Sequence, residues 1–307
     1  MKSLGFALAA MIPTLAAADT LDVPHAIYAD PPADSAHPAS TLAVEIPSHG
    51  AFMNGVVYRP SGVGPFPLVV FVHGLPGNEQ SLDLAQAMRR AGWAVLTFHY
   101  RGAFGSEGKF SIDNVLEDAD ATMQHIRSVA VAKAWNIDRS RVVVMGHSLG
   151  GLAAAHAAQR APERLATVLI APWDPSTLAT LLRPLSPAER ETTANDRWSD
   201  VTHGRLNGVT GPQIAAEIVD HGERWRLADT AGPLESRPLL LITAARDLPS
   251  SKAIGLKAAL AGHTRTFVAT ELESNHGFDD HRIALEVCVL EWLARLPGAP
   301  ESSPFPF

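Results

Sequence analysis

The sequence predicts an α/β fold with a mostly parallel central sheet flanked by helices and a helical cap insert. Six short runs are apolar at nearly every position, which is typical of strands buried on both faces of a parallel sheet. Segments with helical periodicity lie between these runs, and this alternation indicates an open sheet covered on both sides. The interval 174–237 contains no such run, and a plain loop of about 60 residues would be abnormal, so it predicts a helical insertion.

The individual elements follow in chain order. Two strand-like stretches, 41–46 and 51–58, flank the turn Ser48-His49-Gly50 and predict an antiparallel hairpin. The apolar runs that predict the parallel strands are 67–72, 93–98, 141–145, 166–170, 238–243 and 265–269. Helices are predicted between them at 81–91, 111–135, 149–160, 251–261 and 280–295. Shorter helical pieces are predicted inside the insertion at 175–182, 187–193 and 213–220.

The first residues have the pattern of an export signal. Lys2 precedes the uncharged apolar stretch 4–15, and three alanines at 16–18 supply the small residues that a signal peptidase recognises. A membrane anchor is the weaker interpretation, because roughly 15 apolar residues are too few to cross about 30 Å of hydrocarbon. We therefore expect 1–18 to be a signal peptide, and the mature protein to be periplasmic or extracellular with no membrane span.

The rest of the chain divides by composition. Residues 19–40 are rich in Pro, Ala, Asp and Ser, and predict an extended N-terminal arm. Residues 41–173 and 238–297 form the predicted α/β core, and 174–237 form a helical cap or lid. Residues 298–307 contain several prolines and predict a flexible tail.

Composition excludes several classes of function. A chain of 307 residues that is 46% hydrophobic and 19% charged is too apolar to be disordered. Its net charge of −7 gives no general attraction for nucleic acid. The one cysteine, Cys288, cannot form a disulfide within the chain, and the histidines do not cluster at metal-ligand spacing. Neither glycine-rich nucleotide-binding pattern is present, so we expect no cofactor and no metal. The sequence does not indicate an oligomeric state.

The sharpest motif is Gly-His-Ser-Leu-Gly at residues 146–150. It follows a predicted buried strand and opens a predicted helix, which is the context that this motif requires. Ser148 would occupy a tight strand-to-helix turn, and Gly146 and Gly150 would give it room. The helix N-terminus would direct free N–H groups at a developing oxyanion.

With this motif in place, residues 40–296 resemble the α/β-hydrolase superfamily, chiefly its serine esterases and lipases, with some likeness to prolyl-aminopeptidase-type hydrolases. The run His-Gly-Leu-Pro-Gly at 73–77 is similar to that family's oxyanion loop, and 100–108 to its loop after the next strand. Ser148, Asp247 and His276 match the family's nucleophile, acid and base, and they occur in the family order.

The resemblance implies a role for each matched residue. Ser148 would attack the substrate while His276 removes its proton, because imidazole is the side-chain type best suited to act as a base near neutral pH. Asp247 would hold the tautomer of His276 and stabilise the imidazolium. The backbone N–H groups of Leu75 and Leu149 would form the oxyanion hole.

Two of these assignments have competitors. Asp174 also follows a predicted strand end, where some hydrolases place their acid. His281 lies close to His276, although Asp279 and Asp280 resemble the N-cap of the last helix and would place His281 in its first turn. We favour Asp247 and His276.

The expected activity is therefore hydrolysis of small-molecule carboxylic esters through an acyl-enzyme on Ser148. A serine peptidase of the aminopeptidase kind and a thioesterase are the alternatives within the same chemistry. An alternative from another class is a non-catalytic ligand-binding protein on the same scaffold. The substrate itself depends on the pocket that the insertion lines.

Overall fold

A computed structural model describes residues 23–160, 166–262 and 266–300. The predicted signal peptide 1–18 lies outside these residues, as do residues 301–307 of the predicted tail. No helix in the described ranges is both long and apolar enough to cross a membrane.

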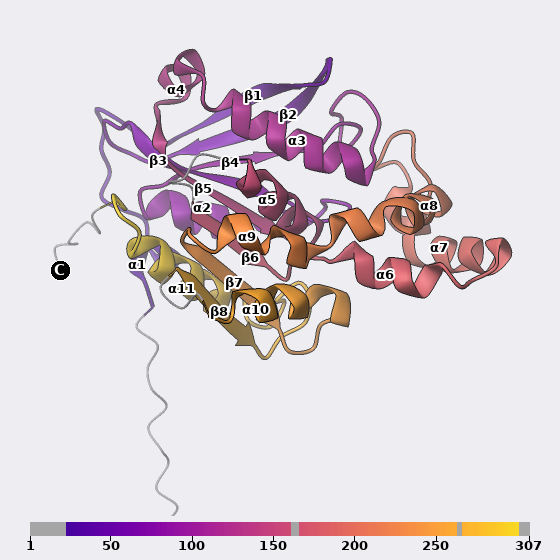
Figure 1. Cartoon of the computed structure of the whole chain (residues 1–307). Helices are drawn as coiled ribbons and strands as arrows, with labels where there is room; N and C mark the ends of the chain where they lie inside the picture. Colours follow the sequence, from indigo (N-terminus) through magenta and orange to yellow (C-terminus); the bar gives the residue numbers. More distant parts are fainter. Residues whose placement is uncertain (1–22, 161–165, 263–265, 301–307) are drawn as a thin grey trace, which may run out of the picture.

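An eight-stranded sheet forms the centre of the molecule, with strand order β1-β2-β4-β3-β5-β6-β7-β8 (Figure 1). β1 pairs antiparallel with β2, and β2 pairs antiparallel with β4; all later neighbours are parallel. This confirms the predicted mostly parallel α/β sheet. The strands are β1 (Ser40–Ser48), β2 (Ala51–Arg59), β3 (Phe66–Val72), β4 (Ala94–Phe98), β5 (Ile137–His147), β6 (Ala166–Ile170), β7 (Leu239–Ala244) and β8 (Phe267–Leu272).

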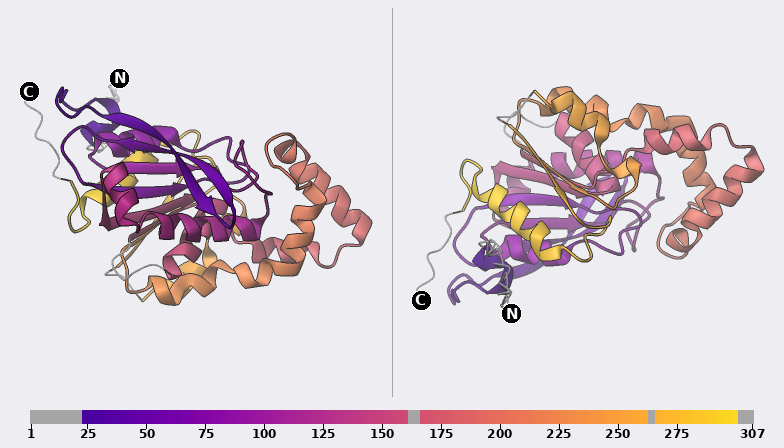
Figure 2. Two further views of the ribbon diagram at one scale, coloured as in Figure 1. Left: turned by 90° about the horizontal axis from the view of Figure 1, so that it is seen from above. Right: turned by 90° about the horizontal axis from the view of Figure 1, so that it is seen from below.

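Helices cover both faces of this sheet, because successive strand side chains point to opposite sides. Val70 and Val72 of β3 pack in one buried cluster with α3 (Ile112–His125) and α5 (Leu149–Gln159). Val69 and Phe71 pack in a second cluster, which contains residues of the helices on the other face: α2 (Leu82–Arg90) and α11 (Arg282–Ala294). The right view of Figure 2 shows α11, in yellow, lying across the strands.

Several predicted elements differ in extent from the structure. The helix predicted over 111–135 is two helices, α3 and α4 (Val129–Trp135), because Ser128 has extended backbone angles, φ −62° and ψ 131°, which a helix cannot continue through. The arm predicted to be extended contains one helical turn, α1 (His25–Tyr28). Arg90 of α2 donates to the carbonyl oxygens of Ala26 and Ile27, which fixes this turn against the core.

The start of the tail is also held to the core. Arg141 Nη1 donates a hydrogen bond of 2.8 Å to the carbonyl oxygen of Gly298. This bond attaches the first residue of the predicted tail, Gly298, to β5. Residues 301–307 of the predicted flexible tail lie outside the described residues.

The interval between β6 and β7 is helical and projects beyond the end of the sheet in both views of Figure 2. Its elements are α6 (Pro175–Leu182), α7 (Pro187–Thr202), α8 (Gly211–His221), two 3-10 turns (Gly222–Trp225 and Leu227–Thr230) and α9 (Ala231–Leu234). A last 3-10 turn (Pro249–Ser251) and α10 (Ile254–Leu260) follow β7.

The α7 helix is longer than the 187–193 segment predicted. Its polar sequence gives a weak periodic signal, and its start is fixed by a capping box between Ser186 and Glu189. Beyond residue 193 it continues because Ala194 and Trp198 are buried. A Cβ added to Gly211 of α8 would lie 2.7 Å from the Ala194 carbonyl oxygen, so the two helices pack very closely there.

Hydrogen bonds attach the insertion to the core at several places. Near its middle, the Asn207 N–H donates to the Gly102 carbonyl oxygen at 2.6 Å, beside an antiparallel bridge between Ala103 and Leu206. Farther along, the Glu217 carboxylate accepts from the first backbone N–H groups of α3, those of Ile112 and Asp113, at 2.9 Å each. A side chain of the insertion thus adds to the N-terminal capping of a core helix, whose N-cap residue Ser111 accepts from the Asn114 N–H.

Candidate active site

Ser148 occupies the sharp turn between β5 and α5. Its φ of 56° and ψ of −120° are strained for a residue with a side chain. The turn is possible because Gly146 and Gly150 lack side chains: a Cβ on Gly146 would lie 2.0 Å from the Gly150 carbonyl oxygen, and one on Gly150 would lie 2.0 Å from the Val72 carbonyl oxygen. The Ser148 N–H donates to the Ile170 carbonyl oxygen at 3.0 Å, which ties the turn to β6.

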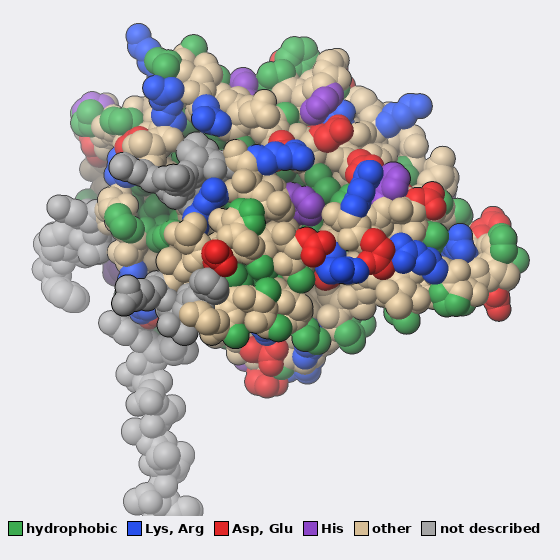
Figure 3. All heavy atoms as spheres, viewed as in Figure 1, with side chains coloured by type: hydrophobic (Ala, Val, Ile, Leu, Met, Phe, Trp, Pro, Cys, Tyr) green, Lys and Arg blue, Asp and Glu red, His purple; other side chains and the backbone are tan. Residues whose placement is uncertain are grey.

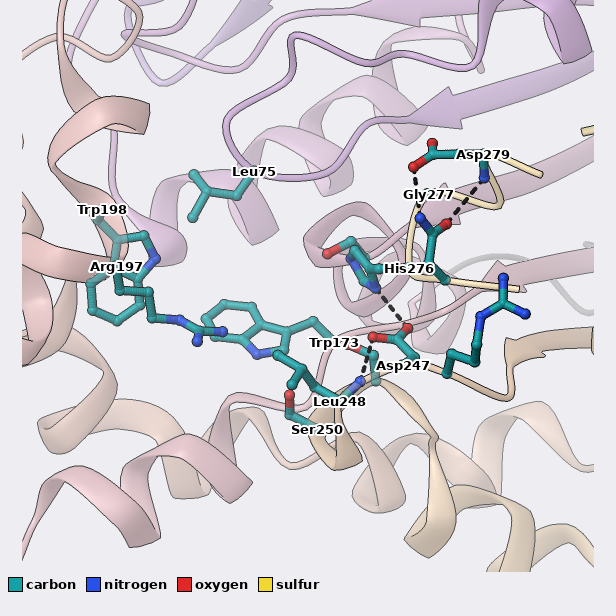
Figure 4. Close-up of a pocket in the computed structure, with 14 residues that line it drawn as sticks. Leu75, Trp173, Arg197, Trp198, Asp247, Leu248, Ser250, His276, Gly277 and Asp279 are labelled. Atoms are coloured by element: carbon teal, nitrogen blue, oxygen red, sulfur yellow. Dashed lines mark hydrogen bonds and ion pairs between the residues drawn. The ribbon is translucent and has the colours of Figure 1, made fainter. Parts of the chain in front are cut away.

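His276 and Asp247 are hydrogen-bonded to each other. Nδ1–H of His276 donates to Asp247 Oδ2 at 2.7 Å, drawn as a dashed line in Figure 4. The Asp247 side chain is 1% exposed and its other oxygen accepts from the Leu248 N–H at 2.6 Å. A carboxylate only accepts, so the neutral imidazole has its proton on Nδ1 and a free lone pair on Nε2. That is the protonation state which general-base catalysis at Nε2 needs.

One cavity of about 620 Å³ joins the predicted residues. Ser148, Asp247, His276 and Leu75 all line it. The structure thus brings together residues that are up to 201 positions apart in the chain (276 − 75) and come from four different strand ends.

The remaining predicted donor, Leu149, is buried and is the first residue of α5. The first N–H groups of a helix have no partner within that helix, and their partial positive charge favours an anion. The predicted oxyanion loop lies directly against the serine, since a Cβ on Gly74 would be 3.1 Å from Ser148 Cβ. Both candidate donors therefore come from segments that adjoin Ser148.

The two competing residues are engaged elsewhere. Asp174 is the N-cap of α6, where its Oδ1 accepts from the Ser176 N–H at 3.0 Å and the Ser176 hydroxyl at 2.6 Å. His281 is the N-cap residue of α11, next to Asp280, and does not line the cavity. The structure thus places Asp247 and not Asp174 beside His276.

His147 is a residue whose place in the site the sequence did not reveal. Its Nε2–H donates to the carbonyl oxygen of His276 at 2.9 Å, and the two rings lie 4.8 Å apart. Burial lowers the pKa of His147 to about 4, and the charge of His276 contributes in the same direction. His147 is therefore neutral at pH 7. Its position immediately before Ser148 was the one signal in the sequence.

A second pair of histidines supports the oxyanion loop. His73 Nδ1–H donates to the Gly74 carbonyl oxygen at 2.7 Å, which leaves Nε2 to accept from His99 Nδ1–H at 3.2 Å. The Tyr100 hydroxyl donates to the His73 carbonyl oxygen at 2.5 Å. Burial lowers the pKa of His73 to about 3, so this arrangement stays uncharged.

One group of possible metal ligands occurs among the described residues, and it lies away from the cavity. Asp113, Glu217 and His221 place ligand atoms within 4.8 Å of one another. Both Glu217 oxygens accept backbone N–H groups of α3, and Asp113 pairs with Arg224 and accepts from Trp225 Nε1. These contacts attach the insertion to α3 and account for the group.

Known proteins resemble the chain in sequence and in fold. A protein-family model described as "Alpha/beta hydrolase family" matches residues 69–297, which is more than half of the chain. The quorum-quenching protein AidA of Acinetobacter baumannii is 34% identical over 120 residues, 37% of this chain. Esterase EstD of Thermotoga maritima is 32% identical over 130 residues, 38% of this chain. The matched segments span 38% of AidA and 30% of EstD, so this chain aligns with less than half of either relative.

Among solved structures, Est1E from Butyrivibrio proteoclasticus with bound ferulic acid superimposes with a TM-score of 0.60. The superposition covers 83% of this chain and 99% of Est1E at 18% identity. At this identity the likeness concerns the fold.

Proposed function

The chain belongs to the alpha/beta hydrolase family, and from this premise we propose that it is a serine hydrolase that cleaves carboxylic esters through an acyl-enzyme on Ser148. The observation that carries the proposal is the 2.7 Å hydrogen bond between His276 and the buried Asp247, at the wall of the cavity that Ser148 also lines. The similarity to an esterase over 130 residues supports the choice of esters.

The proposed reaction has two halves. In the first, Ser148 Oγ attacks the acyl carbon as His276 Nε2 takes the hydroxyl proton, and the imidazolium then gives that proton to the departing alkoxide. In the second, water attacks the acyl-enzyme, His276 takes a proton from it, and the proton returns to Ser148 Oγ as the acid leaves. Asp247 keeps the proton of the neutral imidazole on Nδ1 and stabilises the imidazolium in both halves.

The oxyanion of each tetrahedral intermediate would be bound by the backbone N–H groups of Leu149 and Leu75. Leu149 contributes the positive end of α5, and Leu75 belongs to the loop that His73 and Tyr100 fix. Removal of one such donor typically costs roughly 10²–10³ in rate.

We further propose that the 174–237 insertion is a cap that shapes the substrate cavity. Two of its residues, Arg197 and Trp198, line the cavity together with Ser148. Residues 1–18 are proposed to direct export; an N-terminus at Asp19 in protein purified from the periplasm or medium would support this, and an intact Met1 in exported protein would contradict it.

A fluorophosphonate probe tests the serine hydrolase directly. We expect the wild-type protein to be labelled, Ser148→Ala to be unlabelled, and Ser140→Ala, which changes an exposed serine on β5, to be labelled like the wild type. Loss of the nucleophile should lower kcat by roughly 10⁶. Equal labelling of wild type and Ser148→Ala would refute the assignment, and absence of labelling in both would favour a binding protein.

The type of acyl bond is tested with p-nitrophenyl esters of graded length beside the matching thioesters and aminoacyl-nitroanilides. We expect the largest kcat/KM for esters, because an alkoxide or phenoxide leaves with less help from the general acid than an amine does. Faster hydrolysis of the anilides would assign the protein to the peptidases.

A further inference from the structure

We propose that Arg197 makes the cavity selective for esters that carry a carboxylate some distance from the bond being cleaved. This inference rests on the proposed ester hydrolysis and adds the substrate class. It follows from the position of Arg197, from the partners of the other charged groups, and from the apolar side chains that line the same cavity.

Arg197 reaches the cavity from the insertion. It belongs to α7 and lines the same 620 Å³ cavity as Ser148 and His276. Figure 4 shows its side chain extending from the α7 side toward Trp173. The guanidinium carbon lies 5.6 Å from the centre of the Trp198 ring, a distance that allows cation–π attraction. The indole of Trp198, which lines the same cavity, is thus the one aromatic contact recorded for this cation among the described residues.

The other charged groups that line the cavity form hydrogen bonds within the protein, and all of them but Asp279 have a charged or imidazole partner. Arg246 pairs with Asp280 and donates to the Glu273 carbonyl oxygen at 2.7 Å. Asp279 accepts from the neutral amide of Asn275, Nδ2 to Oδ2, at 2.7 Å. Asp247 is bonded to His276.

Arg197 differs from these groups. It forms no ion pair with any carboxylate whose position the structure describes. Elsewhere on the insertion, acidic and basic side chains are interspersed, as Figure 3 shows for one face, and Arg183 and Arg226 both pair with Glu223. Arg197 thus presents an uncompensated guanidinium to the space in which the substrate would lie.

The chemistry of this group selects an anion. A guanidinium offers planar N–H donors that match the two oxygens of a carboxylate. The side chains of Trp173 and Leu75 line the same cavity, and Figure 4 draws Trp173 between Arg197 and the Asp247–His276 pair; these apolar surfaces suit a carbon skeleton. An ester with an apolar spacer and a carboxylate end would satisfy both. Binding energy at the carboxylate would then hold the acyl carbon in place for attack by Ser148.

The test compares esters that differ by one charge. The acyl-side pair is the mono-p-nitrophenyl ester of adipic acid and the p-nitrophenyl ester of adipamic acid, which have equal length and the same leaving group. The alcohol-side pair is the butanoate ester of 6-hydroxyhexanoate and that of 6-hydroxyhexanamide. We expect the anionic member of at least one pair to have a kcat/KM roughly 10- to 100-fold higher, the size expected for charge-assisted hydrogen bonds.

Variants identify Arg197 as the source of the preference. Arg197→Gln should abolish it by lowering kcat/KM for the anionic ester to the value for its neutral partner, and Arg197→Glu should reverse it. Arg183→Gln removes an equal charge from the insertion outside the cavity, and it should keep the preference. Equal rates within both pairs in the wild-type protein would overturn the proposal, as would a preference that survives Arg197→Gln.

A binding measurement separates this proposal from the proposed reaction. Calorimetry on Ser148→Ala with monomethyl adipate and methyl adipamate requires no turnover. We expect tighter binding of the anion, weakened roughly tenfold by Arg197→Gln. If neutral esters are hydrolysed and Ser148 is labelled but no charge preference appears, only the role of Arg197 fails. Absence of both labelling and ester hydrolysis would instead refute the proposed function.

Discussion

The imidazole of His147 donates a 2.9 Å hydrogen bond to the backbone carbonyl oxygen of His276. Because His147 directly precedes Ser148, this bond joins the turn that holds the proposed nucleophile to the loop that holds the proposed base. The pKa of His147, lowered by burial to about 4, keeps the ring neutral in the working range of such an enzyme. The hydrogen bond thereby fixes the position of one segment relative to the other, and it places no charge from His147 next to His276.

The first prediction concerns this bond. We expect His147→Ala to lower kcat by roughly 10- to 100-fold with little change in KM, because small displacements of a base strongly affect proton transfer. His147→Gln retains an N–H donor and should restore most of the activity. Kinetics on a neutral p-nitrophenyl ester would measure both variants, with thermal unfolding as a check on folding. Unchanged kcat in His147→Ala would show that the bond does not position His276.

The second prediction concerns the serine turn. Gly150→Ala should destabilise the protein by at least about 1–3 kcal/mol, because its Cβ would lie 2.0 Å from the Val72 carbonyl oxygen and backbone atoms would have to move. Gly262→Ala is the control: its Cβ has no neighbour within 4 Å, and Gly262 is not among the glycines with positive φ. That change should be neutral or stabilising by up to about 1 kcal/mol. Equal melting temperatures for the two variants would be inconsistent with the close packing described here.

The third prediction concerns the buried ion pair between Arg101 and Asp118 of α3. Asp118 is fully buried; it accepts from Arg101 Nε at 2.5 Å and from the Ser48 hydroxyl at 2.6 Å. Burial raises the pKa of Asp118 despite these donors. Asp118→Ala leaves the buried Arg101 with the half-exposed Glu117, 2.7 Å away, as its ion-pair partner and removes the acceptor of the Ser48 hydroxyl. It should lower the free energy of unfolding by up to about 3–5 kcal/mol.

Urea denaturation would measure this loss against an exposed pair. Glu291→Ala, which removes the partner of Arg295 on the surface of α11, should cost no more than about 0.5 kcal/mol. Similar midpoints for Asp118→Ala and Glu291→Ala would argue against a structural role for the buried pair.

The fourth prediction concerns pH and His73. Its pKa is lowered by burial to about 3 in the folded protein, whereas an unfolded chain protonates histidine near 6.5. Below about pH 6.5 the unfolded state therefore binds a proton that the folded state does not, and stability falls as the pH is lowered toward 3. Each such histidine contributes at most about 1.4 kcal/mol per pH unit.

His73→Gln keeps a donor for the Gly74 carbonyl oxygen and removes this titration. Between pH 7 and pH 5, we expect its free energy of unfolding to fall less steeply than that of the wild type. The difference in slope should be at most about 1.4 kcal/mol per pH unit, the value for one proton. His147 and His156, whose pKa values burial lowers to about 4, should keep some slope in both proteins. Parallel curves would contradict the neutral, buried state of His73.

The sheet was predictable from the sequence because its signals are local. A strand such as β7 is buried on both faces and is therefore apolar at all but one position. This run of apolar residues is enough to predict the strand. The turn at Ser148 is predictable for the same reason, since backbone strain there requires glycine at fixed spacing. The helix α7 was predicted too short because its continuation depends on packing against α8, which lies farther along the chain.

What the sequence determined by itself was the α/β architecture, the position of Ser148 at its strand-to-helix turn, and a short set of candidate partners. Tertiary structure decided among those partners: it set Asp247 against His276 and engaged Asp174 as the cap of α6. It also brought His147 to the His276 backbone and Arg197 to the cavity. Local patterns reflect the backbone and burial of each segment, whereas hydrogen bonds and cavity walls join residues far apart in the chain, whose distances are fixed only when the elements pack.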